Sequence, residues 1–140
     1  MPVNTRLKPS SSELGLGLLN SDELGRDFPA LRLLVLFGSR ARGQSVAGSD
    51  WDFGYLAEPG LDVDSLCAFL SKVVHADDID VVDLRRSSGV LRHQVAEQGV
   101  AVFEREPEAF TNYIIEVLRF WLDAEPVIRK SQQEQLRALG

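Results

Sequence analysis

The sequence has too few cysteine and histidine residues for a disulfide framework or a zinc site. It contains one cysteine, Cys67, and two histidines, His75 and His93, which are isolated from one another along the chain. A single cysteine cannot form an internal disulfide, and zinc sites need several His or Cys ligands at close spacing. The sequence therefore excludes a fold held by internal disulfides and offers no zinc-binding pattern.

Long apolar runs and an excess of basic residues are missing as well. No segment has the eighteen or so consecutive apolar residues needed to cross a bilayer, and Met1 to Leu7 lack the apolar run of a signal peptide. The formal net charge is -6, whereas proteins that hold a polynucleotide usually carry a basic patch. We therefore expect a cytoplasmic protein with no membrane partner and no direct contact with nucleic acid.

Length and composition are those of one globular domain. The 140 residues are 44% hydrophobic and 26% charged, close to the average for soluble domains, and they are too few for two domains of ordinary size. Residues 1–12 are polar, rich in turn-forming types and without periodicity. We expect a flexible N-terminal arm at 1–12 and a single domain at 13–140, with a C-terminal helix from about residue 107.

Four short apolar runs have the length of strands. The first, Leu31 to Phe37, is apolar apart from Arg32 and stops at Gly38-Ser39, which indicates a strand buried on both faces. The others cover residues 51–56, 79–84 and 100–103.

Helices are predicted around these strands. Ser21 resembles the start of a short helix at 21–28, and apolar residues at intervals of three and four predict a helix at 63–74. A further helix is expected at about 90–98, with Ser87 and Ser88 as candidate N-caps and Gly99 as a left-handed C′ residue. The alternation of strands and helices predicts an α+β (mixed α/β) layer fold.

The last helix is predicted from an apolar stripe that should pack on the domain. Phe120 lies off this stripe, so it is the better candidate for contact with a partner protein, whereas Tyr113 and Trp121 are expected in the core. The stripe consists of Phe110, Tyr113, Ile114, Val117, Leu118, Trp121 and Leu122.

The segment between the first two strands carries the residues that indicate chemistry. Gly38-Ser39 ends a buried strand, and Asp50 and Asp52 open the next one. Residues i and i+2 of a strand point to the same side, so these two carboxylates share a face at about 7 Å. Like charges held so close repel unless a cation lies between them, and Mg²⁺ prefers carboxylate together with phosphate oxygens. Mn²⁺ could take its place.

The turn before this pair is suited to phosphate. Gly38 lets the backbone approach a phosphate, Ser39 and nearby N–H groups can donate to it, and Arg40 and Arg42 add positive charge. Each part alone has a plain structural reading: Gly-Ser is commonly an ordinary turn, and Asp-x-Asp a solvated strand edge or a cap. Their combination after a buried strand favours nucleotide chemistry.

These residues closely resemble the Gly-Ser-x₁₀-Asp-x-Asp signature of the DNA polymerase β-like nucleotidyltransferase superfamily, in particular its minimal (MNT) branch, in which Gly-Ser-Arg-Ala-Arg-Gly is common. The likeness spans roughly residues 31–103 and implies a small mixed sheet flanked by helices. It also implies a third carboxylate on a later strand, here Asp80, with Asp83 on the opposite strand face as the alternative. Two departures are Trp51, where an aliphatic residue is commoner, and Gly54, which is expected to interrupt the strand. Trp51 should point away from the metal ligands.

Within this branch, three segments resemble antitoxins of the MntA type from type VII toxin–antitoxin systems. Such proteins adenylylate a tyrosine of a HEPN-domain ribonuclease toxin with ATP as donor. The resemblance implies that Asp50 and Asp52 bridge two Mg²⁺ ions, that Asp80 holds one of them, and that Ser39 grips the β- and γ-phosphates. The three segments are Val81 to Arg86, Leu91 to Val95 and Arg119 to Leu122.

Two other functions remain open from the sequence. One is nucleotidyl transfer to a small molecule such as an aminoglycoside, although 140 residues leave no room for an acceptor domain. The other is an antitoxin without catalysis that acts by binding alone. A group of basic residues could line the triphosphate or a partner surface, or be an exposed helix face: Arg85, Arg86, Arg92 and His93.

Overall fold

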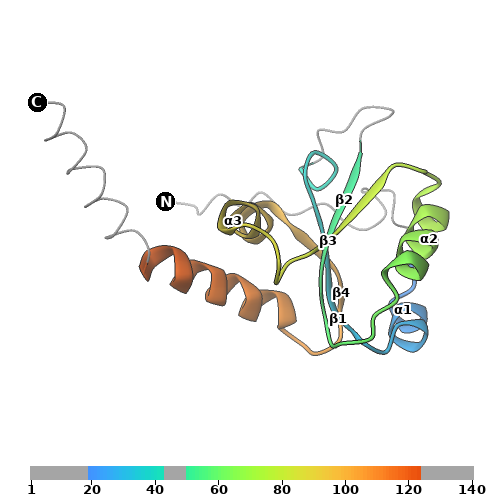
Figure 1. The fold of residues 1–140 in the computed structure, drawn as a ribbon, viewed down its shortest axis with the longest axis horizontal. Coiled ribbons are helices and arrows are strands. Elements are labelled where there is room, and N and C mark those ends of the chain that lie inside the picture. Colours follow the sequence, from blue (N-terminus) through green and yellow to red (C-terminus); the bar gives the residue numbers. More distant parts are fainter. Residues whose placement is uncertain (1–18, 43–49, 124–140) are drawn as a thin grey trace, which may run out of the picture.

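The computed structural model describes residues 19–42 and 50–123, which form a four-stranded mixed sheet with helices on both faces (Figure 1). The predicted α+β fold is confirmed. The N-terminal arm at 1–12 lies outside the described residues, so the arm and the domain boundary after it stay predictions.

The sheet has the strand order β3-β2-β1-β4. Its strands are β1 (Leu31–Phe37), β2 (Trp51–Ala57), β3 (Ile79–Asp83) and β4 (Val100–Glu104), each within one residue of the predicted bounds. β1 pairs antiparallel with β2 and β4, and β2 pairs parallel with β3. The parallel pair needs a crossover connection, which helix α2 (Val63–Val74) supplies.

The predicted helices are present. α1 covers Ser21–Asp27 and α3 covers Gly89–Gln98, and residues 109–123 are helical as well. α1 begins at Ser21 as predicted, and its N-cap is Asn20, whose side chain accepts from the backbone N–H groups of Asp22 and Glu23. The N-cap of α3 is Ser88, one of the two serines expected there.

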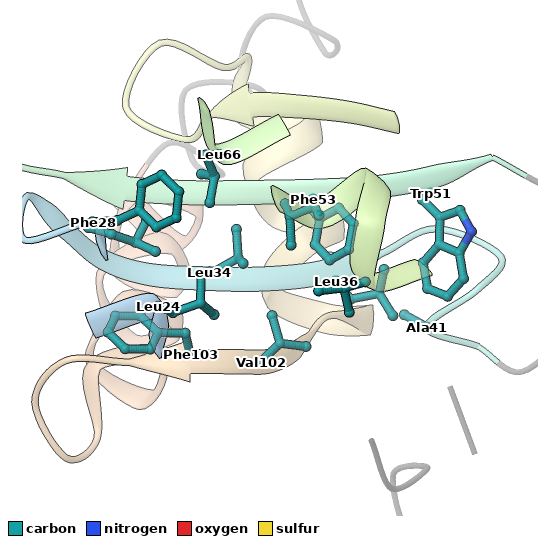
Figure 2. Packing of buried hydrophobic residues seen from close by; sticks show 13 residues of the cluster. Leu24, Phe28, Leu34, Leu36, Ala41, Trp51, Phe53, Leu66, Val102 and Phe103 are labelled. Atoms are coloured by element: carbon teal, nitrogen blue, oxygen red, sulfur yellow. The ribbon is translucent and has the colours of Figure 1, made fainter. Parts of the chain in front are cut away.

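β1 is buried on both faces, as its continuous apolar run predicted. Leu34 and Leu36 pack with α1 and α2 on one face (Figure 2), whereas Leu33 and Val35 pack with α3 and the helix at 109–123 on the other. The two pairs of helices therefore enclose the sheet as outer layers.

Two predictions about glycines were wrong. Gly99 is extended, with φ -71 and ψ 157, and not left-handed. It is required for space, because a Cβ there would lie 2.5 Å from Cγ1 of Val35. Gly54 does not interrupt β2, which runs through it. It makes room for Leu84, whose Cδ2 would lie 2.6 Å from an added Cβ.

The helix at 109–123 follows its predicted stripe for only part of its length. Tyr113 and Val117 are both 2% exposed and lie in the core, but Leu118 is 44% exposed and Leu122 63% exposed. The expectation that Trp121 is a core residue was also wrong, since it is 36% exposed. The helix begins on the sheet and then runs outward from it (Figure 1), so its last described turns have no sheet to cover.

Arg105 joins α1 to the sheet, a role that the sequence did not predict. Its guanidinium and Nε donate to the backbone oxygens of Gly25, Phe28 and Leu31 at 2.7–3.1 Å. The bond to Gly25 satisfies a carbonyl in the last turn of α1, and the other two tie Arg105 to the connection from α1 into β1.

In the part of the chain that the structure describes, no helix is both long enough and apolar enough to span a membrane.

Candidate active site

The end of β1 is shaped by Gly38. This residue has φ +76, in the left-handed region that favours glycine, and the chain then turns so that the Arg42 N–H donates to the Gly38 oxygen at 3.3 Å. A Cβ on Gly38 would lie only 2.5 Å from Oδ2 of Asp52. Gly38 is therefore needed both for the turn and for the position of the Asp52 carboxylate.

Asp52 and Asp80 lie side by side on neighbouring strands. They are paired across the parallel β2–β3 ladder, and paired residues in a sheet point to the same face. Gly54, two residues beyond Asp52 on β2, points to the same face and lies against Leu84. Leu84 belongs to the core cluster that contains residues of α3, so α3 covers the face that carries Asp52 and Asp80. The two carboxylates are thus brought together by strand register.

The electrostatics of Asp52 reflect its acidic neighbours. Burial raises the pKa of the Asp52 carboxyl above its ordinary value, and the charges of Asp80 and Asp50 raise it further. Three negative groups therefore act on one another at this end of the sheet. A bound cation would relieve this repulsion.

Asp50 precedes β2 and is exposed. With Asp80 it lines a cavity of about 250 Å³ whose other walls are Asp77, Asp78 and Ile79. Sequence reasoning missed Asp77 and Asp78, although the run Asp77-Asp78-Ile79-Asp80 was a signal that acidic side chains gather before β3. The backbone N–H of Trp51 donates to the backbone oxygen of Asp78 at 3.4 Å, which ties the loop before β3 to the start of β2.

Within residues 19–42 and 50–123, no three His, Cys, Asp or Glu side chains are gathered closely enough to hold a metal ion. Asp50, Asp52 and Asp80 would therefore have to rotate their side chains toward a shared cation, as expected for charges that repel one another. Their oxygen donors are those that Mg²⁺ prefers, and the charges of Asp80 and Asp50 add to the effect of burial in raising the pKa of Asp52. The residues fit a divalent cation.

Asp83 has different surroundings. It is paired in register with Tyr55, its carboxylate accepts from the Arg85 N–H at 2.9 Å, and Nε of Arg86 lies 3.9 Å away. Since Asp83 is three residues beyond Asp80 on the same strand, the two point to opposite faces. Of the two candidates, the geometry favours Asp80 as the neighbour of Asp52.

Trp51 points away from the carboxylates, as expected. It is 4% exposed and packs in the cluster formed with α1 and α2, where its ring stacks on Phe53 at 6.2 Å (Figure 2). The Arg40 guanidinium lies over this ring at 4.3 Å from its centroid. The unusual tryptophan thus serves packing and also holds Arg40.

The two arginines of the turn point to different partners. While Arg40 stacks on Trp51, Nη1 of Arg42 donates to the side-chain oxygen of Gln98 at 2.8 Å. Gln98 is the last residue of α3, which covers the same sheet face as Asp52. Ser39, which precedes both arginines, is partly exposed. Arg42 is therefore the arginine directed toward the face of the carboxylates.

The predicted basic residues lie before α3, at Arg85 and Arg86, and within it, at Arg92 and His93. Arg85 and Arg86 are exposed, whereas the His93 ring stacks on Trp121 at 4.6 Å and lies 3.7 Å from a Glu97 oxygen. His93 thus joins α3 to the outward-running helix. Among the described residues, the large apolar side chains that remain exposed all belong to these two helices: Val90, Ile115, Leu118, Phe120, Trp121 and Leu122.

Comparisons with known proteins agree with this geometry. A model of the family described as polymerase beta, nucleotidyltransferase, matches residues 22–108. Protein adenylyltransferase MntA of Aphanizomenon flos-aquae is 35% identical over 118 residues, which are 76% of this chain and 75% of that protein. Its namesake from Shewanella oneidensis is 40% identical over 75 residues, which are 52% of this chain and 54% of that protein.

Among solved structures, a chain of a toxin–antitoxin crystal structure with AMP-PNP superimposes with a TM-score of 0.60 at 29% identity, over 81% of this chain and 99% of that chain. A chain of the toxin–antitoxin pair MntA–HepT gives a TM-score of 0.53 at 27% identity, over 79% of this chain and 92% of that chain. The family match contains the Gly38 turn, the starts of β2 and β3 and all four strands of the sheet. The chain therefore belongs to the polymerase β nucleotidyltransferase family, among the MntA protein adenylyltransferases.

Proposed function

We propose that this chain is a Mg²⁺-dependent antitoxin that transfers AMP from ATP to a tyrosine of a partner HEPN-family ribonuclease toxin and so neutralises it. The observation that carries the proposal is the pairing of Asp52 with Asp80 across β2 and β3, beside a glycine turn that contacts Asp52. The names of the relatives, protein adenylyltransferase and toxin–antitoxin with AMP-PNP, support the donor and the partner.

Asp50, Asp52 and Asp80 would hold the divalent cations, two Mg²⁺ ions for which Mn²⁺ can substitute. When bound, the ions neutralise charge on the phosphates and lower the pKa of the attacking hydroxyl. The chain itself keeps the Asp52 carboxylate at the Gly38 turn, where a side chain on residue 38 would displace it.

The turn after β1 would hold the triphosphate. The Ser39 hydroxyl and backbone N–H groups donate to phosphate oxygens, and Arg42 supplies positive charge from the side of α3. With the phosphates fixed, the tyrosine oxygen attacks the α-phosphorus in line. The bond between this phosphorus and the oxygen that bridges the α- and β-phosphates breaks, and pyrophosphate leaves. Positioning accounts for much of the rate in such a reaction.

The partner surface is proposed to include Phe120, which is 55% exposed. The exposed apolar residues of α3 and the helix at 109–123 lie on the side of the sheet that carries Asp52 and Asp80. A toxin bound there would face the catalytic carboxylates. The net charge of -6 has the sign that complements a ribonuclease, whose own substrate is an anion. The proposal places the protein in the cytoplasm.

The test mixes the purified protein with the candidate toxin, Mg²⁺ and ATP labelled on either the α- or the γ-phosphate. Label on the toxin from α-labelled ATP alone, lost in Asp50→Asn and Asp52→Asn, is the expected result. Asp83→Asn is the matched control, because Asp83 lies on the same strand as Asp80 but faces Tyr55; it should keep transfer.

Other outcomes would contradict the proposal. Label from γ-labelled ATP would mean phosphoryl transfer. A toxin that is silenced without any label would mean inhibition by binding alone. Label on an aminoglycoside but not on the toxin would mean a small-molecule acceptor.

A further inference from the structure

Gln98 joins the end of α3 to the turn after β1. Its side-chain oxygen accepts a hydrogen bond from Nη1 of Arg42 at 2.8 Å, between residues 56 positions apart in sequence, at a partly buried location. The backbone N–H of Arg42 donates to Gly38 at the start of the same turn. Arg42 is thus held at its backbone by the turn and at its guanidinium by α3.

The end of α3 is itself fixed to the sheet. Val95 is fully buried, and the Gly99 N–H donates to the Val95 oxygen at 2.8 Å. Gly99 approaches β1 so closely that an added Cβ would lie 2.5 Å from Cγ1 of Val35. Gln98, between these two residues, therefore cannot move relative to β1 without breaking close packing.

The chemistry of the pair suits an arginine that must remain a cation. A neutral amide oxygen orients a guanidinium through a hydrogen bond but does not neutralise its charge, as a carboxylate would. The carboxylate next in sequence, Glu97, is directed to His93 at 3.7 Å instead. The Gln98 amide therefore gives the Arg42 guanidinium an acceptor that adds no negative charge of its own.

We infer that Gln98 is a positioning residue that holds the Arg42 guanidinium in place for the β- and γ-phosphates of ATP. The role rests on the proposed function, in which the turn after β1 binds the triphosphate. An oriented guanidinium loses less side-chain entropy when it binds phosphate than one that must first be ordered.

The test compares Gln98→Ala with Gln94→Ala, the same substitution one turn earlier on α3. Affinity for ATP and for AMP is measured by calorimetry on the full chain, together with KM and kcat for transfer. Gln98→Ala should weaken ATP binding and raise KM roughly three- to tenfold, the value of one hydrogen bond, with AMP affinity and kcat within about twofold. Gln94→Ala should change none of these.

A double-mutant cycle separates positioning from a general structural effect. In an Arg42→Ala background, Gln98→Ala should have no further effect on ATP affinity. The change in melting temperature caused by Gln98→Ala should be the same in the wild-type and Arg42→Ala backgrounds. Equal losses for ATP and AMP, or a full additional loss in the Arg42→Ala background, would overturn the inference. If Gln98→Ala lowers the melting temperature, Gln98→Lys replaces it, because the lysine ammonium would repel the Arg42 guanidinium. This variant is judged by the same comparison of ATP and AMP affinities in both backgrounds.

The binding measurements keep this inference separate from the proposed function. A protein that binds ATP with the expected Gln98 dependence but labels no toxin would retain the positioning role and lose the proposed acceptor. A wild-type protein that does not bind ATP would overturn both.

Discussion

The contact between Gly38 and Asp52 leads to a sharp prediction for Gly38→Ala. The new methyl carbon would lie 2.5 Å from Oδ2 of Asp52, and an ordinary contact would require the carboxylate to retreat by about 1 Å. A misplacement of about 1 Å can cost on the order of 100-fold in rate. Because the contact is with a proposed metal ligand, we expect a loss of that size in kcat, with a smaller change in ATP affinity.

The matched control is Gly60→Ala. Gly60 also has a positive φ, +102, but an added Cβ there meets nothing within 4 Å. Both substitutions place alanine in a backbone conformation that costs roughly 1–2 kcal/mol, so both should lower the free energy of unfolding by a similar amount. Only Gly38→Ala should impair AMP transfer.

The assay is transfer from α-labelled ATP at saturating toxin, beside urea unfolding of both variants. If Gly38→Ala is folded and retains kcat within about threefold of wild type, the reasoning from the Asp52 contact is refuted. If Gly60→Ala loses transfer to the same extent, backbone strain and not the carboxylate is responsible.

Three further predictions concern charge, anchoring and the partner surface. The raised pKa of the Asp52 carboxyl contributes to the free energy of unfolding below about pH 4, and this contribution is lost as the pH rises through the folded-state pKa. In EDTA, Asp52→Asn should therefore have a higher melting temperature than wild type at pH 7, and the difference should disappear near pH 4. An equal difference at both pH values would contradict this. Arg105→Leu removes three bonds to backbone oxygens and should lower the free energy of unfolding in urea by about 2–4 kcal/mol, whereas Arg86→Leu, which loses one exposed ion pair, should cost under about 1 kcal/mol. Phe120→Ser should weaken toxin binding at least roughly tenfold without changing ATP affinity in calorimetry; unchanged toxin affinity would remove this residue from the interface.

Local periodicity predicted where two residues at the start of β2 point. Because side chains alternate along a strand, Asp52 could be assigned to one face and Trp51 to the other before any tertiary contact was known, whereas Asp50 lies just before the strand. The apolar run of β1, ending at Gly38-Ser39, likewise predicted a strand buried on both faces. These features depend only on residues a few positions apart.

Periodicity failed where the surroundings of an element change along its length. The stripe from Phe110 to Leu122 has the spacing of a packed helix, yet the helix runs outward beyond the sheet and leaves Leu122 63% exposed. Gly99 resembled a left-handed cap in sequence, but its actual requirement is space against Val35. In both cases the deciding neighbour is distant in the chain.

The sequence by itself determined the order of strands and helices along the chain, the two aspartates at the start of β2 and the glycine turn that precedes them. The tertiary structure alone decided that Asp80, and not Asp83, lies beside Asp52, because that depends on the register of two parallel strands joined through α2. It also decided that Arg42 meets Gln98. Hydrophobic patterning sets which face of an element is buried, but only the packing of distant segments sets which polar side chains meet at their ends.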